Sequence, residues 1–131
     1  MMDVVEALRA FLLTDAGVAA LVGERVFVTV APQDAALPLV VLRRVSTPRA
    51  YAHTGASRLA WPRVQVTARA ARQAEAAAVA KAVRQAVSGY RGTMGDVPVQ
   101  AVFVDNENDG FLFETGKFER VLDVILWHAE D

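Results

Sequence analysis

Residues 61–88, WPRVQVTARAARQAEAAAVAKAVRQAVS, carry the strongest structural signal in this chain. Apolar and polar side chains alternate over residues 61–70, which predicts a half-buried strand, interrupted at Pro62 because proline cannot donate to a sheet ladder. Apolar side chains recur at helical spacing over residues 72–88, and Gly89 is placed to end that helix. Because so many of its residues are alanine, we expect this helix to lie close against a sheet.

The preceding part of the chain predicts two helices and two strands. Asp3 and Glu6 have the spacing of a capping box at the start of an amphipathic segment. Thr14 is placed to cap a second, short helix, which Gly23 ends. The β-branched stretches that follow are separated by a turn containing two prolines. The predicted elements are helices over residues 3–13 and 15–22 and strands over residues 25–30 and 39–45.

The remaining segments predict two further strands and one long connection. Residues 97–104 and 117–128 have strand character, and the polar residues 105–110, DNENDG, are expected to form the tip between them. Residues 117–128 are apolar on both faces, so we place this strand centrally. Residues 46–60 have no periodicity, and they are either a functional loop or two strand extensions joined by a mobile tip.

Together these elements predict a single α+β domain over residues 1–131. We expect a mainly antiparallel sheet of four to five strands, with the N-terminal helix, the short helix and the long Ala-rich helix packed on one face. The 131 residues include no cysteine, which excludes a disulfide scaffold and a thiolate metal site. The net charge of −1 argues against binding nucleic acid through bulk positive charge. We expect neither a signal peptide nor a membrane span.

No motif predicts catalysis, a cofactor or a metal. Residues 105–110 resemble half of a calcium loop, but Gly116 stands where the loop needs a bidentate carboxylate. Gly110 to Lys117 misses the spacing of a phosphate-binding loop. His128 is expected to be a satisfied surface or edge residue, and His53 lies in the long connection, where it could contact a partner. We therefore predict that the protein is not an enzyme.

The charges are distributed unevenly along the chain. No acidic residue occurs between Asp34 and Glu75, a stretch that contains seven arginines. From Val97 to the C-terminus there are eight acidic residues and only two basic ones, Lys117 and Arg120. In one interpretation these strands are neighbours in one sheet and their charges pair within the subunit. In the other, a subunit has a basic and an acidic edge and associates head to tail, which closes into a ring when the rotation permits.

Four segments, in this order, resemble the tail completion or tail terminator family of long-tailed bacteriophages and gene transfer agents. They are EALRAFLLTDAGVAALVGERVF from residue 6, APQDAALPLVVLRRVS from residue 31, RVQVTARAARQAEAAAVAKAVRQAV from residue 63 and FERVLDVILWH from residue 118. The resemblance covers nearly the whole chain and consists of apolar positions rather than a catalytic signature.

The resemblance implies a structural virion protein that is assembled in the host cytoplasm and located in the tail or neck. Such subunits form a ring, commonly a hexamer, on the head-proximal end of the tail tube. The ring ends tube polymerisation and offers the head connector a docking surface, while DNA passes through its lumen without specific contact. Alternatives are another neck or stopper ring, and, in a different class, a small ligand-binding or enzymatic domain or a nucleic-acid binder that uses the arginines.

The charge argument, rather than the resemblance, selects the expected interface. The basic side chains would face acidic side chains of a neighbouring subunit. The residues expected at the subunit or partner interface are Arg43, Arg44, Arg49, Tyr51, His53, Arg58, Arg63, Asp105, Glu107, Asp109 and Glu114.

Overall fold

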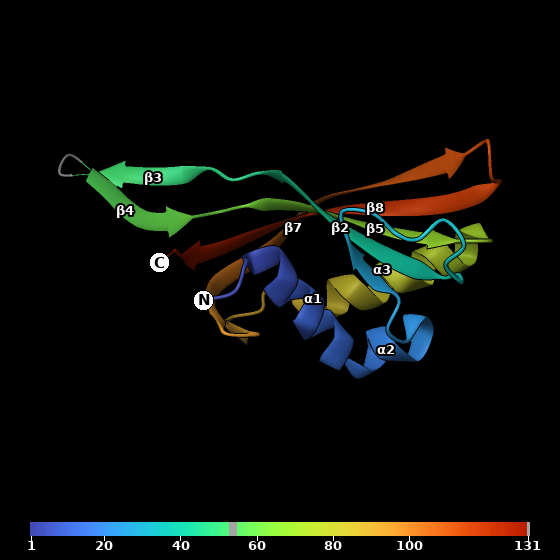
Figure 1. Ribbon diagram of the computed structural model, residues 1–131, viewed down its shortest axis with the longest axis horizontal. Helices are drawn as coiled ribbons and strands as arrows, with labels where there is room; N and C mark the ends of the chain where they lie inside the picture. Colours follow the sequence, from blue (N-terminus) through green and yellow to red (C-terminus); the bar gives the residue numbers. More distant parts are fainter. Residues whose placement is uncertain (53–54, 131) are drawn as a thin grey trace.

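The computed structural model describes residues 1–52 and 55–130, and these form three helices and eight strands. All three helices lie on one side of a strongly twisted sheet, as predicted (Figure 1). No described helix has both the length and the apolar character needed to cross a membrane. The elements are α1 Val4–Thr14, α2 Ala16–Val22, β1 Val26–Val28, β2 Leu39–Ser46, β3 Arg49–Ala52, β4 Gly55–Ala60, β5 Arg63–Ala70, α3 Gln73–Val87, β6 Gly92–Met94, β7 Val97–Leu112 and β8 Lys117–Ala129.

β8 is the central strand, as its apolar faces predicted. It pairs antiparallel with β5, from Arg63 opposite Ile125 to Ala70 opposite Phe118, and with β7 along nearly its whole length. Its last residues also pair with β4. β4 and β5 therefore follow one another along β8, and the break between them falls at Trp61 and Pro62, where the interruption was expected.

The sheet is larger and more mixed than the predicted four to five antiparallel strands. β1 pairs parallel with β2, with Val26 opposite Val40, because the connection through residues 29–38 crosses over instead of turning back. Of the two alternatives predicted for residues 46–60, the strand extensions are confirmed, since β3 and β4 extend the neighbouring strands β2 and β5. The predicted tip between them, at residues 53–54, lies outside the described residues. β6 adds a short strand at the β7 edge.

The predicted hairpin tip at residues 105–110 is wrong. These residues continue β7 and pair with β8, with Asp109 opposite Arg120, and the turn comes later, at residues 113–116. A run of polar residues is typical of a turn in the sequence. Here the polar residues belong to a two-stranded ribbon that projects from the sheet and is exposed to solvent. Gly116, with φ +67°, supplies the left-handed conformation of the actual turn.

One apolar core joins the helices to the covered face of the sheet. It contains Leu8 and Leu12 of α1, Val83 of α3, and Leu122 and Leu126 of β8, all fully buried. Asp3 caps α1 as predicted, and its carboxylate accepts a hydrogen bond from the Val5 amide. α2 is capped by Asp15, which accepts from the Val18 amide at 3.0 Å, and not by the predicted Thr14, whose hydroxyl donates to the Phe11 carbonyl instead.

Candidate interaction surface

Two arms of the sheet, at opposite ends of the molecule, form the candidate functional site. The basic arm comprises residues 43–52 and 55–60 and contains the β3–β4 hairpin. The acidic arm comprises residues 106–119 and contains the β7–β8 turn. Figure 1 shows the first at the left and the second at the upper right. Because the arms point away from each other, they do not contact one another within one subunit.

The arms differ in charge. The described part of the basic arm contains four arginines and no acidic residue. The acidic arm contains Glu107, Asp109, Glu114 and Glu119 but only one basic residue, Lys117. The fold therefore places part of each charge block at opposite ends of the molecule. The separation is incomplete, because Arg69 of the basic block pairs with Glu119 of the acidic arm and Glu130 of the acidic block pairs with Arg49 of the basic arm.

Several arginines of the predicted interface have partners within the subunit. Arg49 donates two hydrogen bonds to the Glu130 carboxylate, at 2.7 and 3.1 Å. Arg44 pairs with Asp3 and donates to the Thr47 hydroxyl at 2.7 Å. These contacts orient the guanidinium groups at the base of the basic arm while leaving the side chains partly exposed.

Arg43 and Arg58 have no acidic partner among the described residues. Arg43 donates to the neutral Gln65 amide oxygen at 2.9 Å. Arg58 is exposed and adopts a positive φ of 68°. Tyr51, on β3, is 74% exposed. His53, also expected at this surface, lies outside the described residues.

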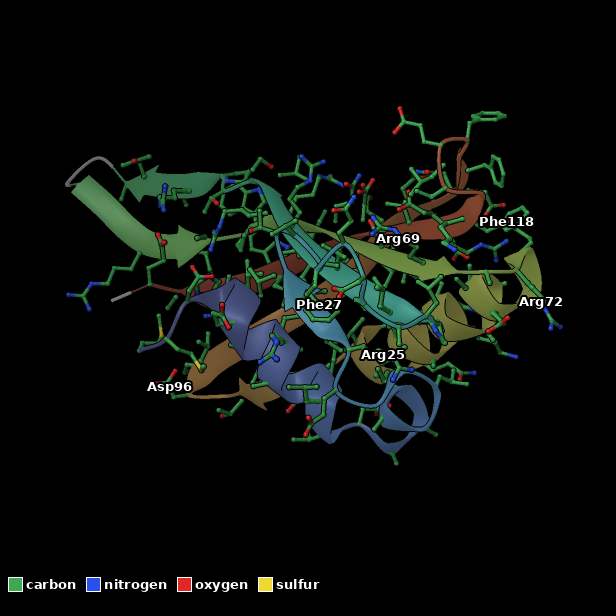
Figure 2. All side chains as sticks on the ribbon, turned by 45° about the vertical axis from the view of Figure 1, so that its right-hand side comes forward. Arg25, Phe27, Arg69, Arg72, Asp96 and Phe118 are labelled. Atoms are coloured by element: carbon green, nitrogen blue, oxygen red, sulfur yellow. The ribbon has the colours of Figure 1, made fainter. Side chains whose placement is uncertain are left out.

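Arg63 and Asp105 meet between the arms, on the face of the sheet that no helix covers. The Arg63 guanidinium lies 3.0 Å from the Asp105 carboxylate and 3.9 Å from that of Asp123. Arg69 likewise pairs at 2.9 Å with Glu119, the residue directly opposite on β8, and Figure 2 labels Arg69. Charge pairing within one sheet, the first of the two interpretations, is thus present in the subunit.

Arg120 lies one residue outside the acidic arm, opposite Asp109, and is the centre of a charge cluster at the base of the arm. The Arg120 guanidinium donates to Asp109 at 2.7 Å and to Glu107 at 3.2 Å. Arg84, from α3, lies 3.8 Å from Glu107. Glu114 is exposed in the turn at the end of the arm.

Hydrogen bonding shifts the pKa values of the best-paired groups. The hydrogen bond from Arg120 lowers the pKa of Asp109 below its ordinary value of 3.8, and the hydrogen bond from Arg49 lowers the pKa of Glu130. The carboxylates in turn raise the pKa of both guanidinium groups. These two charge pairs, Arg49 with Glu130 and Arg120 with Asp109, therefore stay ionised at neutral pH.

We expect Asp109→Asn to reduce the acid sensitivity of the fold. A lowered pKa means that the Arg120 pair contributes its full stability above about pH 4 and loses it as pH falls through the lowered value. Urea unfolding between about pH 5 and pH 2 should therefore show a smaller loss of stability in the variant than in the wild type. Glu114→Gln, in the exposed turn, is the matched control, and parallel curves for Asp109→Asn and wild type would contradict the expectation.

Contacts between aromatic side chains were not predicted from the sequence, and two groups of them lie on the sheet. Phe111, Phe113 and Phe118 lie together at the end of the acidic arm, with ring centroids 4.9 Å apart for Phe111 and Phe113 and 4.8 Å apart for Phe111 and Phe118. Trp61 and Trp127 stack at 4.6 Å. The phenylalanines of residues 111–113, next to a polar run, were the signal that could have revealed the first group.

Among the described residues, neither the remaining histidine nor the main groove favours a ligand-binding or catalytic alternative. His128 is 4% exposed, not at the surface as predicted, because β8 is flanked by β4 and β7 there. A groove of about 300 Å³ lies between the β1–β2 connection and the acidic arm, lined among others by Leu37, Leu112 and Lys117. The groove is open to solvent, whereas small-molecule sites usually enclose most of the ligand.

The model of the family described as tail completion protein gp17 matches residues 6–129. The chain belongs to this tail completion family. It is accordingly a structural tail protein of the virion, from a family that is not known for catalysis.

The fold of this tail completion protein also occurs in a solved structure. A chain in the structure titled "Virion of native gene transfer agent (GTA) particle" superposes with a TM-score of 0.80 and 24% sequence identity. The match covers 95% of this chain and 93% of that chain. No curated protein gives a significant match.

Proposed function

We propose that residues 1–131 act as one subunit of a closed ring on the head-proximal end of the tail tube. The ring ends tube polymerisation and presents a docking surface to the head connector. The observation that carries the proposal is the match to the tail completion family over residues 6–129 in a chain whose oppositely charged arms lie at opposite ends. A chain of the same fold occurs in the gene transfer agent virion, which supports a location in the virion. The tail completion family favours the tail or neck as the place within it.

The two arms give the subunit a head-to-tail contact. Complementary surfaces at opposite ends of one molecule bind a different patch on each neighbour, and such heterologous contacts close into rings when the rotation permits. The basic arm of one subunit faces the acidic arm of the next. The proposed contact residues are Arg43, Arg44, Arg49, Tyr51, His53 and Arg58 on one side and Glu107, Asp109 and Glu114 on the other, with Arg63 and Asp105 at the margin.

The proposed ring is a hexamer. It contacts the tail tube protein on one face and the connector or stopper protein on the other. DNA passes through the lumen without specific contact, which a net charge of −1 favours because strong positive charge would retain the phosphates. Assembly takes place in the host cytoplasm.

Light scattering of the purified protein over a concentration series tests self-assembly. We expect an oligomer near six times the subunit mass that dissociates as salt is raised, since salt screens exposed charges over roughly 8 Å at physiological ionic strength. Incubation with tail tubes should then give capped ends. A protein that neither oligomerises nor caps tubes contradicts the proposal, and one that binds only the connector is a neck or stopper component instead.

A further inference from the structure

The end of the acidic arm carries an unusually exposed aromatic side chain. Phe113 is 88% exposed, and Phe111 beside it is 39% exposed. Leaving apolar rings in water forgoes the free energy of burying them, about 25 cal/mol for each Å². Exposed aromatic groups at the end of a projecting hairpin are typical of contact surfaces, where aromatic side chains contribute much of the binding energy.

The turn holds Phe113 in a defined position. The Gly116 amide donates to the Leu112 carbonyl at 2.7 Å, which closes the turn. Phe111 contacts Phe113 edge-on, with an interplanar angle of 86°, and packs in turn against Phe118, which Figure 2 labels near the end of the arm. The contact with Phe111 restricts the Phe113 side chain, which lowers the conformational entropy lost on binding and suits Phe113 to act as an anchor.

The opposite end of the same subunit offers a matching surface. The basic arm exposes two large apolar side chains, Tyr51 at 74% and Val45 at 49%. They are interspersed with the arginines, of which Arg43 and Arg49 each retain substantial exposure. Arginine binds the face of an aromatic ring favourably, and Glu114 next to Phe113 adds complementary charge.

We propose that Phe113 is the aromatic anchor of the contact between two copies of this chain, and that it binds the basic arm of the next copy beside Tyr51 and Val45. This inference rests on the proposed ring, and it names a side chain that adds affinity to the charge-paired contact. Charge complementarity orients the two arms, while burial of Phe113 supplies the attraction that salt does not screen.

Cross-linking tests the contact directly, because the chain contains no cysteine of its own. One full-length variant carries Thr115→Cys at the tip of the acidic arm, and a second carries Ala52→Cys on the basic arm. Mixing the two with a short bismaleimide should give mainly mixed dimers, even when association is transient. Ala20→Cys, at an exposed position on α2 away from both arms, replaces Thr115→Cys in the control and should give far fewer dimers with Ala52→Cys.

Introducing Phe113→Ala tests the role of the Phe113 side chain itself. In the Thr115→Cys variant it should lower the yield of mixed dimers by on the order of tenfold, the effect of losing a moderate interface hot spot. Val30→Ala, which removes another exposed apolar side chain, should leave the yield unchanged. Equal yields with and without Phe113, or equal yields for the tip and control cysteines, would overturn the inference.

The outcomes separate this inference from the proposed function. If wild-type protein caps tubes and Phe113→Ala lowers capping but not self-association, the anchor binds the tube and not a second copy, so the inference fails while the function stands. If tubes are not capped but the specific cross-link forms and depends on Phe113, the contact between copies is correct and the proposed role on the tail tube fails.

Discussion

Reversing two charges of the basic arm, with Arg43→Glu and Arg58→Glu together, is expected to abolish ring formation in a subunit that still folds. Like charges brought together across an interface cost several kcal/mol. Because each 1.4 kcal/mol corresponds to about a tenfold change in affinity, association should weaken by at least about a hundredfold. Both residues are exposed, and the hydrogen bond of Arg43 to Gln65 is to a neutral group, so its replacement breaks no internal charge pair there.

The measurement is the concentration dependence of the light-scattering mass, together with circular dichroism to verify the fold. Lys81→Glu with Arg91→Glu makes the same change in net charge at exposed positions outside both arms, and this control should assemble normally. Adding Glu114→Arg to a neighbouring subunit should restore part of the lost association, because it returns an opposite charge to the contact. Assembly that survives the reversal would show that the basic arm is not the interface.

Leu122→Ala is expected to cause the largest loss of stability among the substitutions considered. Leu122 is fully buried in β8, opposite Val66 of β5, and belongs to the core under the helices. Truncating a buried leucine removes its apolar contacts and leaves a cavity, which typically costs about 2–5 kcal/mol. Since β8 holds β5 on one side and β7 on the other, both arms depend on this layer.

Urea unfolding measures this effect. The midpoint should fall strongly while the dependence of stability on denaturant stays close to the wild-type value, as expected for a change in packing alone. Val30→Ala removes an exposed side chain and should change stability by less than about 0.5 kcal/mol. A loss for Leu122→Ala no larger than that of the control would mean that the site relaxes to fill the cavity.

The helices and the central strand follow from the sequence because their signals are local. Apolar spacing placed α3 over residues 72–88, within one residue of the observed Gln73–Val87. Apolar residues on both faces identified β8 as central, which its pairing with β5 and β7 confirms. The wrong prediction at residues 105–110 also results from relying on local signals, because exposed polar residues have a similar local sequence in a projecting ribbon and in a turn.

The candidate site depends less on local signals. Counting charges separated a basic block from an acidic block, but it could not show that Arg63 and Asp105 pair within the subunit while Glu114 reaches the far end of an arm. Those relations depend on the register between β5, β7 and β8 and on the bulge between Val104 and Asn106. A register is set by packing over the whole sheet, so no short window of sequence contains it.

From the amino-acid sequence alone came the α+β class, the three helices, the central strand, the uneven charge and the resemblance to the tail completion family. The parallel pairing of β1, the extension of the sheet into two arms and the exposure of Phe113 at the end of one of them emerged only from the folded chain. The physical reason is the range of the interactions involved. Helix formation and strand alternation are decided by neighbours along the chain, whereas strand partners and exposed surfaces depend on residues that are distant in sequence and meet only when the core closes.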